Sequence, residues 1–126
     1  MSSRYCLGID TSNYKTSVAM TDEHNNIIFE KSEFLEVEHG ALGLRQSIAF
    51  FKHVNVLPLF IEEAISKVDV SNIRCISVSD TPRRVAGSYM PVFLAGYNAA
   101  KILSASLEIP LYTFSHQEGH VAAVLK

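Results

Sequence analysis

The pattern of hydrophobic and polar residues predicts short strands separated by polar turns over the first part of the chain. Tyr5–Asp10 is apolar up to its last residue, and Thr16–Thr21 alternates, with Val18 and Met20 on one face. Ile27–Lys31 begins with three apolar residues after a polar turn that holds two adjacent asparagines. These segments predict three consecutive antiparallel strands.

A helical pattern then replaces the alternation. Glu33–Gly43 is predicted to be a loop, and a helix is predicted to begin near Leu44. Pro58 disfavours helical geometry at the residue before it, so we expect a bend or break around Val54–Leu57. A second helical piece is expected to continue to about Lys67.

Strand and helix signals alternate through the second half of the chain. Ile73–Val78 predicts a fourth strand, and a long loop over Ser79–Met90 follows it. Pro91 suits the first turn of a helix that continues to about Leu107. Because that helix is apolar or small on nearly every side, we expect it to be largely buried. Leu111–Phe114 predicts a fifth strand.

The predicted element order is β-β-β-α-β-α-β-α, with the last helix beginning just after residue 115. Three antiparallel strands joined to parallel βα units make a mixed five-stranded sheet with helices on its faces. This α/β order resembles the repeating half of the actin, hexokinase and Hsp70 ATPase fold, a ribonuclease H-like architecture. A resemblance in fold does not by itself define a function.

Two histidines occupy the start of the last predicted helix. Ser115 is a good N-cap residue, and Glu118 completes a Ser-x-x-Glu capping box. His116 and His120 then project from one helical face and can fill two positions of a metal's coordination shell. Neutral imidazole suits zinc and iron. The alternative is that both are polar residues on a solvated first turn, and a metal site needs a third ligand from elsewhere.

Composition bounds the class of protein. At 126 residues with 48% hydrophobic and 19% charged residues, the chain fits one globular domain rather than a disordered segment. The net charge of −2 gives no global basic surface, so nucleic-acid contact must be local or come from a partner. Cys6 and Cys75 fall in predicted core strands and are expected to be reduced. The sequence shows no signal peptide and no membrane-spanning run, which predicts a cytoplasmic protein.

Three segments carry a closer resemblance. They are GIDTSNYKTSVAM from Gly8, LPLFIEEAI from Leu57, and AGSYMPVFLAGYNAAKILSASLEIPLYTFSHQEGHVAA from Ala86. Together they resemble the amino-terminal lobe of the TsaD family, whose older name is O-sialoglycoprotein endopeptidase or glycoprotease. The resemblance implies a transferase that places a threonylcarbamoyl group on a tRNA adenosine beside the anticodon. It also implies an ATP or adenylate ligand, a divalent metal (zinc or iron) and a TsaB-like partner subunit.

The family resemblance also implies site residues. His116 and His120 match the family's two metal-binding histidines, which an aspartate from the carboxy-terminal lobe completes. His53 matches a histidine of the family's first helix. The family's first nucleotide-facing hairpin corresponds in this chain to Thr11, Ser12, Asn13 and Lys15. We expect this hairpin to lie at the same end of the sheet as His116, because both segments occupy strand ends.

Each of the nucleotide residues has a simpler interpretation, and the chain departs from the family pattern. Thr11–Asn13 can serve only to close a hairpin, and Lys15 can be a solvated turn lysine. Asp80–Gly87 stands where the family has a Gly-Pro-Gly loop. Tyr14 and Lys15 replace acidic residues, and Phe51 replaces a common arginine. The pattern indicates a divergent paralogue.

Three function classes compete. The first is the tRNA-modifying transferase, for which Arg83 and Arg84 offer a local basic patch toward tRNA phosphate, the alternative being plain surface charge. The second is a metallopeptidase, which needs a His-Glu-x-x-His helix; here Gln117 follows His116 and Glu118 is used in the capping box. The third is a non-catalytic TsaB-like subunit, which the histidine pair disfavours.

The sequence ends six residues after His120 in an apolar stretch without a C-cap signal. We therefore expect residues 1–126 to form a single amino-terminal lobe of a two-lobed fold, with the carboxy-terminal lobe absent. Alone, such a lobe is expected to lack transferase activity and to bind metal weakly, since two histidines lack their carboxylate, so that metal and ATP or adenylate can both be absent from it. Apolar surface on the last helix favours a homodimer.

Overall fold

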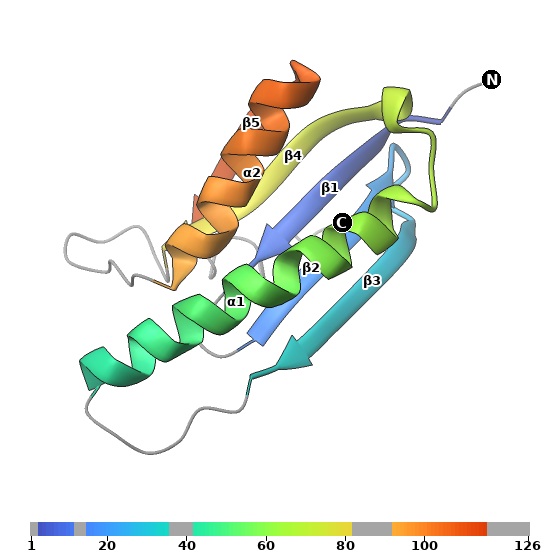
Figure 1. Cartoon of the computed structure of the whole chain (residues 1–126). Coiled ribbons are helices and arrows are strands. Elements are labelled where there is room, and N and C mark those ends of the chain that lie inside the picture. The colour runs from blue at the N-terminus through green and yellow to red at the C-terminus, as the bar shows by residue number, and fades with distance from the viewer. Residues whose placement is uncertain (1–2, 12–14, 36–41, 82–91, 116–126) are drawn as a thin grey trace.

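The structure is a computed structural model that describes residues 3–11, 15–35, 42–81 and 92–115. Five strands form one sheet in the order β3-β2-β1-β4-β5 (Figure 1). The elements are β1 (Tyr5–Asp10), β2 (Lys15–Asp22), β3 (Ile27–Phe34), α1 (Leu42–Ile65), the single-turn 3₁₀ helix η1 (Val70–Asn72), β4 (Ile73–Thr81), α2 (Phe93–Leu107) and β5 (Leu111–Ser115).

The sheet is mixed, as predicted. β1 pairs antiparallel with β2, and β2 pairs antiparallel with β3. β4 joins the other edge of β1 in parallel, and β5 joins β4 in parallel. β1 is therefore the central strand. The helix predicted after β5 lies outside the described residues.

Both described helices lie on one face of the sheet (Figure 1). The alternate residues of the strands that point toward them are buried and form one core with the inner sides of α1 and α2. The core side chains are Leu7, Ile9, Val18, Met20, Leu57, Phe60, Ala64, Ile73, Ile76, Val78, Ala95 and Ala100. The other face of the central strands carries small, half-buried residues, among them Cys6, Gly8, Ser17, Ala19, Cys75 and Ser77. We call it the small-residue face.

The predicted break in the first helix is wrong. α1 runs without interruption from Leu42 to Ile65, with Pro58 inside it. Leu57 and Phe60, on either side of the proline, are 2% and 4% exposed and anchor the helix to the sheet. Packing of this apolar face outweighs the local cost of the proline.

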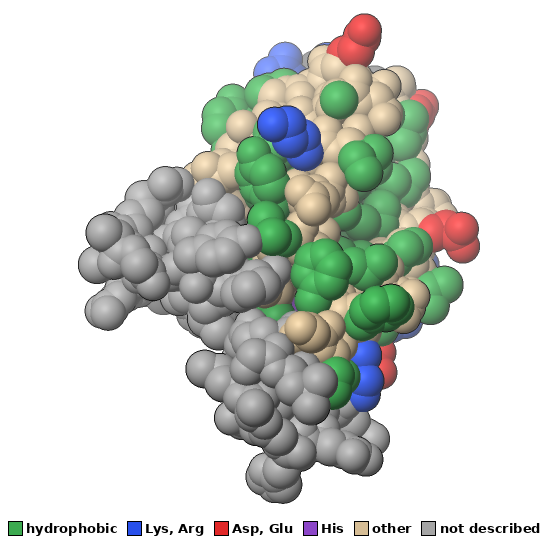
Figure 2. Space-filling model, turned by 60° about the vertical axis from the view of Figure 1, so that its left-hand side comes forward, with side chains coloured by type: hydrophobic (Ala, Val, Ile, Leu, Met, Phe, Trp, Pro, Cys, Tyr) green, Lys and Arg blue, Asp and Glu red, His purple; other side chains and the backbone are tan. Residues whose placement is uncertain are grey.

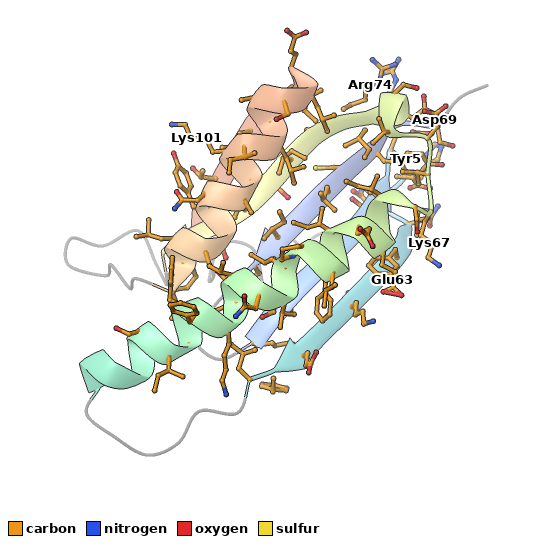
Figure 3. The ribbon with its side chains drawn as sticks, viewed as in Figure 1. Tyr5, Glu63, Lys67, Asp69, Arg74 and Lys101 are labelled. Atoms are coloured by element: carbon orange, nitrogen blue, oxygen red, sulfur yellow. The ribbon has the colours of Figure 1, made fainter. Side chains whose placement is uncertain are left out.

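Two other expectations need correction. β3 continues to Phe34 and so includes the first two residues of the predicted loop, because the ladder with β2 extends to Lys15. α2 is buried only on its inner side; Ile102 is 66% exposed, and Lys101 points away from the sheet (Figure 3). Small residues on a helix permit close packing without requiring it on every side.

The end of α2 positions the last strand. Glu108 takes a left-handed conformation with φ of 56°, and the Ile109 N–H donates to the Ser104 carbonyl at 3.1 Å. The Ser104 hydroxyl in turn donates to the Ile109 carbonyl at 2.6 Å. The Pro110 carbonyl then accepts from the Ile76 N–H at 3.0 Å, which begins the pairing of β5 with β4.

Candidate functional site

One end of the sheet gathers the candidate residues. Because β1, β4 and β5 are parallel, their carboxyl ends meet there, and the antiparallel strand β2 begins there. In open α/β sheets this is the end at which ligands bind. Thr11 and Lys15 both lie at this end, which we call the ligand end. Of the other predicted site residues, Ser12, Asn13, His116 and His120 lie outside the described residues.

Thr11 is fully buried and connects β1 to α2. Its hydroxyl donates to the Val92 carbonyl at 2.8 Å and accepts from the Gly96 N–H at 3.2 Å. The single hydroxyl hydrogen is therefore used within the protein, and one oxygen lone pair remains. Thr11 holds the first turn of α2 against the ligand end.

Asp10 is a site residue that the sequence analysis did not single out. It ends the central strand, is half-buried, and its Oδ1 accepts from the Ser79 hydroxyl at 2.7 Å. Ser79 itself is fully buried at the end of the adjacent strand β4. The signal available in the sequence was an acidic residue that closes an otherwise apolar strand. Its position at the meeting point of β1 and β4 suits a carboxylate that acts on a ligand.

Lys15 supplies a positive charge on the β2–β3 side of the ligand end. It is half-buried, is paired in register with Phe34, and its Nζ lies 5.5 Å from the centre of the Phe34 ring. The Phe34 ring is 75% exposed. An ammonium over an exposed aromatic face gains a cation–π attraction of about 0.5–1 kcal/mol, which orders the side chain while water still reaches it.

His53 belongs to the interior rather than to a ligand surface. Its side chain is fully buried on α1, and its Nδ1 lies 2.6 Å from the hydroxyl of Thr16, which is also fully buried. The pair joins α1 to β2 next to the ligand end. A buried polar pair of this kind positions the helix against the strand.

The resolved pKa shifts lie at the opposite end of the sheet. The backbone hydrogen bond from Asn26 lowers the pKa of Asp22, and the backbone hydrogen bond from Ser71 lowers the pKa of Asp69. Asp69 lies close to Tyr5 and Arg74, where β1 and β4 begin (Figure 3). Both carboxylates stabilise turns. Among residues 3–11, 15–35, 42–81 and 92–115, no three His, Cys, Asp or Glu side chains gather to hold a metal.

A groove runs between α1 and α2. Its volume is about 370 Å³, and none of its described lining residues is charged. Val54 and Ile102, on opposite walls, are 43% and 66% exposed. Hydrophobic side chains gather over this side of the molecule with few charged ones among them (Figure 2). The lining residues are Phe50, Val54, Leu57, Pro58, Ile61, Ala95, Asn98, Ala99, Ile102 and Leu103.

The fold defines a class of protein. The structure is similar to that of YeaZ from Pseudomonas aeruginosa, with a TM-score of 0.62, 18% identity, and coverage of 89% of this chain and 44% of that one. It is also similar to the ethanolamine utilization protein EutJ from Carboxydothermus hydrogenoformans, with a TM-score of 0.51, 13% identity, and coverage of 88% and 36%. The chain therefore has the actin-like α/β fold.

The sequence places the chain within that class. Residues 28–126 match the model of the TsaD family, tRNA N6-adenosine threonylcarbamoyltransferase, and the chain belongs to this family. The transferase of that name from Thermotoga neapolitana is 34% identical over 120 residues, which are 94% of this chain and 35% of that protein. The Bacillus subtilis transferase is 35% identical over 122 residues, 94% of this chain and 34% of that protein.

The chain spans about a third of the length of these curated relatives. In the part of the chain that the structure describes, neither helix is long and apolar enough to cross a membrane.

Proposed function

We propose that this chain is the amino-terminal lobe of a tRNA threonylcarbamoyl transferase-like protein that binds an adenylate-type ligand at the ligand end. The observation that carries the proposal is that Asp10, Thr11, Lys15 and Ser79 all lie at the ligand end of the sheet, in a chain of the TsaD family. A second lobe forms the far wall of the cleft, and transfer to tRNA requires both lobes.

The proposed role of each side chain follows from its chemistry. Lys15 offers a cation to phosphate oxygens, and Asp10, held by Ser79, accepts hydrogen bonds or neutralises a cation that accompanies the nucleotide. Thr11 holds α2 at this end, and Ser12 and Asn13, which follow it in the sequence, are proposed to contribute hydrogen-bond donors to the phosphates. This arrangement combines positive charge and directed donors, as phosphate sites require.

The metal belongs to His116 and His120. Two imidazoles fit zinc or iron by donor type, and in this proposal an aspartate of the second lobe completes the set. A bound divalent metal supplies Lewis-acid polarisation. The glycoprotease alternative lacks support from the sequence, because Gln117 stands where a His-Glu-x-x-His helix has its general base.

The partner in this proposal is a TsaB-like subunit, and the uncharged groove between α1 and α2 is where it docks. An apolar groove with exposed side chains on both walls is typical of helix-in-groove association. Association with such a subunit in the cytoplasm, with tRNA as the substrate, follows from the family. A homodimer through the same groove is the competing outcome.

Nucleotide binding tests the site directly. We would titrate the protein with the non-hydrolysable ATP analogue AMP-PNP and Mg²⁺ by calorimetry. Lys15→Ala and Asp10→Asn are each expected to weaken binding about tenfold, a loss of about 1.4 kcal/mol. Lys31→Ala is the matched control, because Lys31 pairs with Glu63 away from the ligand end. Equal affinity in all four proteins would refute the proposed site.

In this proposal metal binding and activity require both lobes, so they are tested in a two-lobed protein that carries this lobe. There, His116→Ala and His120→Ala are each expected to remove the bound metal, measured by elemental analysis, and to abolish threonylcarbamoyl transfer to tRNA. Unchanged metal content would refute the histidine assignment. Peptide cleavage without transfer would favour the glycoprotease alternative.

The partner surface has its own test. Ile102→Asp is expected to abolish co-purification with a TsaB-like subunit, because it places a charge in the groove without disturbing the core. Ile28→Asp is the control, since Ile28 is also exposed (43%) but lies on β3 away from the groove. Sedimentation of the chain alone distinguishes a homodimer, and association unaffected by Ile102→Asp would refute the docking surface.

A further inference from the structure

The only two cysteines of the sequence are neighbours across the central strands. Cys6 on β1 and Cys75 on β4 are register partners, and neither forms a disulfide. The register skips Arg74 between Tyr5 and Cys6, and this shift is what sets Cys75 opposite Cys6. Both cysteines are half-buried on the small-residue face.

Parallel pairing sets the approximate separation of the two cysteines. Neighbouring strands lie about 4.7–4.9 Å apart, and register partners project side chains to the same face. Equivalent atoms of the two cysteines are therefore separated by about the strand spacing when their rotamers match. The Cys6 Sγ already lies 4.0 Å from the Ser77 Oγ, so the Cys6 thiol inclines toward β4.

The surroundings leave room on that side of the pair. Gly8 follows Cys6 on the same face of β1 and pairs with Ser77. A Cβ built on Gly8 would lie 3.4 Å from the Ser77 Oγ, an ordinary van der Waals contact. With glycine there, the space beside the Cys6 and Cys75 thiols stays free of a β1 side chain.

The spacing favours a bridging atom over a direct sulfur–sulfur bond. A disulfide requires Cβ atoms about 3.5–4.5 Å apart, which is shorter than the strand spacing, so the two central strands would have to approach each other. A single thiophilic ion with metal–sulfur bonds of about 2.3 Å spans about 4.6 Å between two thiolates in line. No group of three ligating side chains exists in the described ranges, so a four-coordinate zinc site is not offered there.

We propose that Cys6 and Cys75 form a two-coordinate thiolate site for a soft monovalent cation of the Cu(I) class. Soft thiolate ligands select Cu(I) among biological metals. On binding, each thiol loses its proton to solvent and each sulfur donates an electron pair to the ion, so two protons are released and no atom changes oxidation state. The bound ion joins β1 to β4, whose opposite ends carry Asp10 and Ser79.

The test is an anaerobic titration of the protein with Cu(I) held by a chromogenic bicinchoninate competitor. We expect one Cu(I) per chain, and X-ray absorption should show two sulfur neighbours. Cys6→Ser and Cys75→Ser are each expected to weaken binding at least 100-fold, because either change leaves one thiolate. Ser77→Ala, the matched control, removes the neighbouring hydroxyl and should keep full affinity.

Three results would overturn the proposal. One is Cu(I) affinity no greater than that of free glutathione, which would mean an adventitious ion only. Another is full binding by either single-cysteine variant, which would place the ion on other ligands. The last is a mass loss of 2 Da when the metal-free protein is treated with a peroxide. That loss would report a direct disulfide between Cys6 and Cys75, and would show that β1 and β4 do approach each other.

Discussion

Buried hydroxyl groups at the ligand end are used chiefly to hold elements together. The Thr11 hydroxyl contacts two backbone atoms of α2, and the Thr16 hydroxyl contacts His53 on α1. The charged side chains described at this end are the Asp10 carboxylate, which accepts from Ser79, and the Lys15 ammonium. Substitutions at the two threonines therefore report on stability before they report on binding.

Gly96 is the closest approach of α2 to β1. A Cβ added there would lie 3.0 Å from the Thr11 Oγ1 and 3.1 Å from the Ile9 Cγ2, and neither neighbour can move cheaply because both are buried. Gly96→Ala is expected to lower the free energy of unfolding by about 1–2 kcal/mol, since overpacking exceeds the helical gain of alanine. Urea unfolding measures it. Gly8→Ala, whose Cβ meets its nearest atom at 3.4 Å, should change stability by less than about 0.5 kcal/mol. Equal effects of the two substitutions would contradict the close approach.

The Thr16–His53 pair permits a second test at the scale of single residues. Thr16→Val keeps the shape of the side chain and removes the 2.6 Å hydrogen bond to His53. Because both partners are fully buried, the change should lower the free energy of unfolding by about 1–3 kcal/mol. Thr21→Val, on the same strand but half-buried, is the control and should stay within about 0.5 kcal/mol. A Thr16→Val protein as stable as the control would show that the bond contributes nothing.

At the scale of elements, α1 contains Pro58 in its interior, where a proline is normally unfavourable. Pro58 is exposed and has no N–H to donate to the Val54 carbonyl one turn earlier. Pro58→Ala is expected to raise the free energy of unfolding by about 2 kcal/mol, the helix-interior cost of proline less the unfolded-state entropy it removes. Thermal unfolding measures the gain. Asn55→Ala, also exposed on α1, should add only about 0.5 kcal/mol. No gain at Pro58 would mean that the helix already compensates for the missing bond.

The turn before β4 gives stability a dependence on pH. The Ser71 N–H donates to Asp69 at 3.0 Å, and this bond holds the pKa of Asp69 below its ordinary value of 3.8. A carboxyl whose pKa is lower in the folded state stabilises fully above pH 3.8 and loses that contribution as the pH falls through its folded pKa. The stability difference between the native protein and Asp69→Asn should therefore shrink when urea unfolding is moved from pH 6 to pH 3. Ser71→Ala keeps the backbone donor and should retain most of this pH dependence. A difference that grows on acidification would contradict the assignment.

The elements show which features sequence patterns could predict. One side of β1, β2 and β4 is buried, which restricts the residues on that side, and the connections between the strands restrict the sheet to few topologies. β3 is exposed along most of its length and was predicted from its apolar start and the turn before it. The unbroken α1 was missed because the burial of Leu57 and Phe60 is a tertiary effect. Asp10 was missed for a similar reason, since its partner Ser79 is 69 residues away in the chain. Lys15 could be named as a candidate, but its contact with Phe34 depended on the register of β2 and β3.

At the scale of the whole molecule, the two faces of the sheet carry different kinds of side chain. The face under α1 and α2 holds the large apolar core, and the small-residue face holds the paired cysteines. β1 contributes to both faces and ends at Asp10. The six residues of β1 thus contribute to the core, to the cysteine pair through Cys6, and to the ligand end through Asp10.

The last prediction concerns the cooperativity of this single core. Leu7 is 0% exposed at the centre of β1 and packs in the same cluster as Leu57 on α1 and Ala100 on α2. Leu7→Ala should lower the free energy of unfolding by about 2–5 kcal/mol, because the cavity lies in the core that the sheet shares with α1 and α2. Leu59→Ala, at a leucine that is 66% exposed, should cost less than about 0.5 kcal/mol.

Both variants and the native protein should unfold in one transition by far-ultraviolet circular dichroism and by tyrosine fluorescence, which is usable because the chain has no tryptophan. If the transitions seen by circular dichroism and by fluorescence occurred at different points in Leu7→Ala, the sheet and the helices would be independent units. The shared core requires instead that they unfold together, since removing either layer exposes the apolar side of the other.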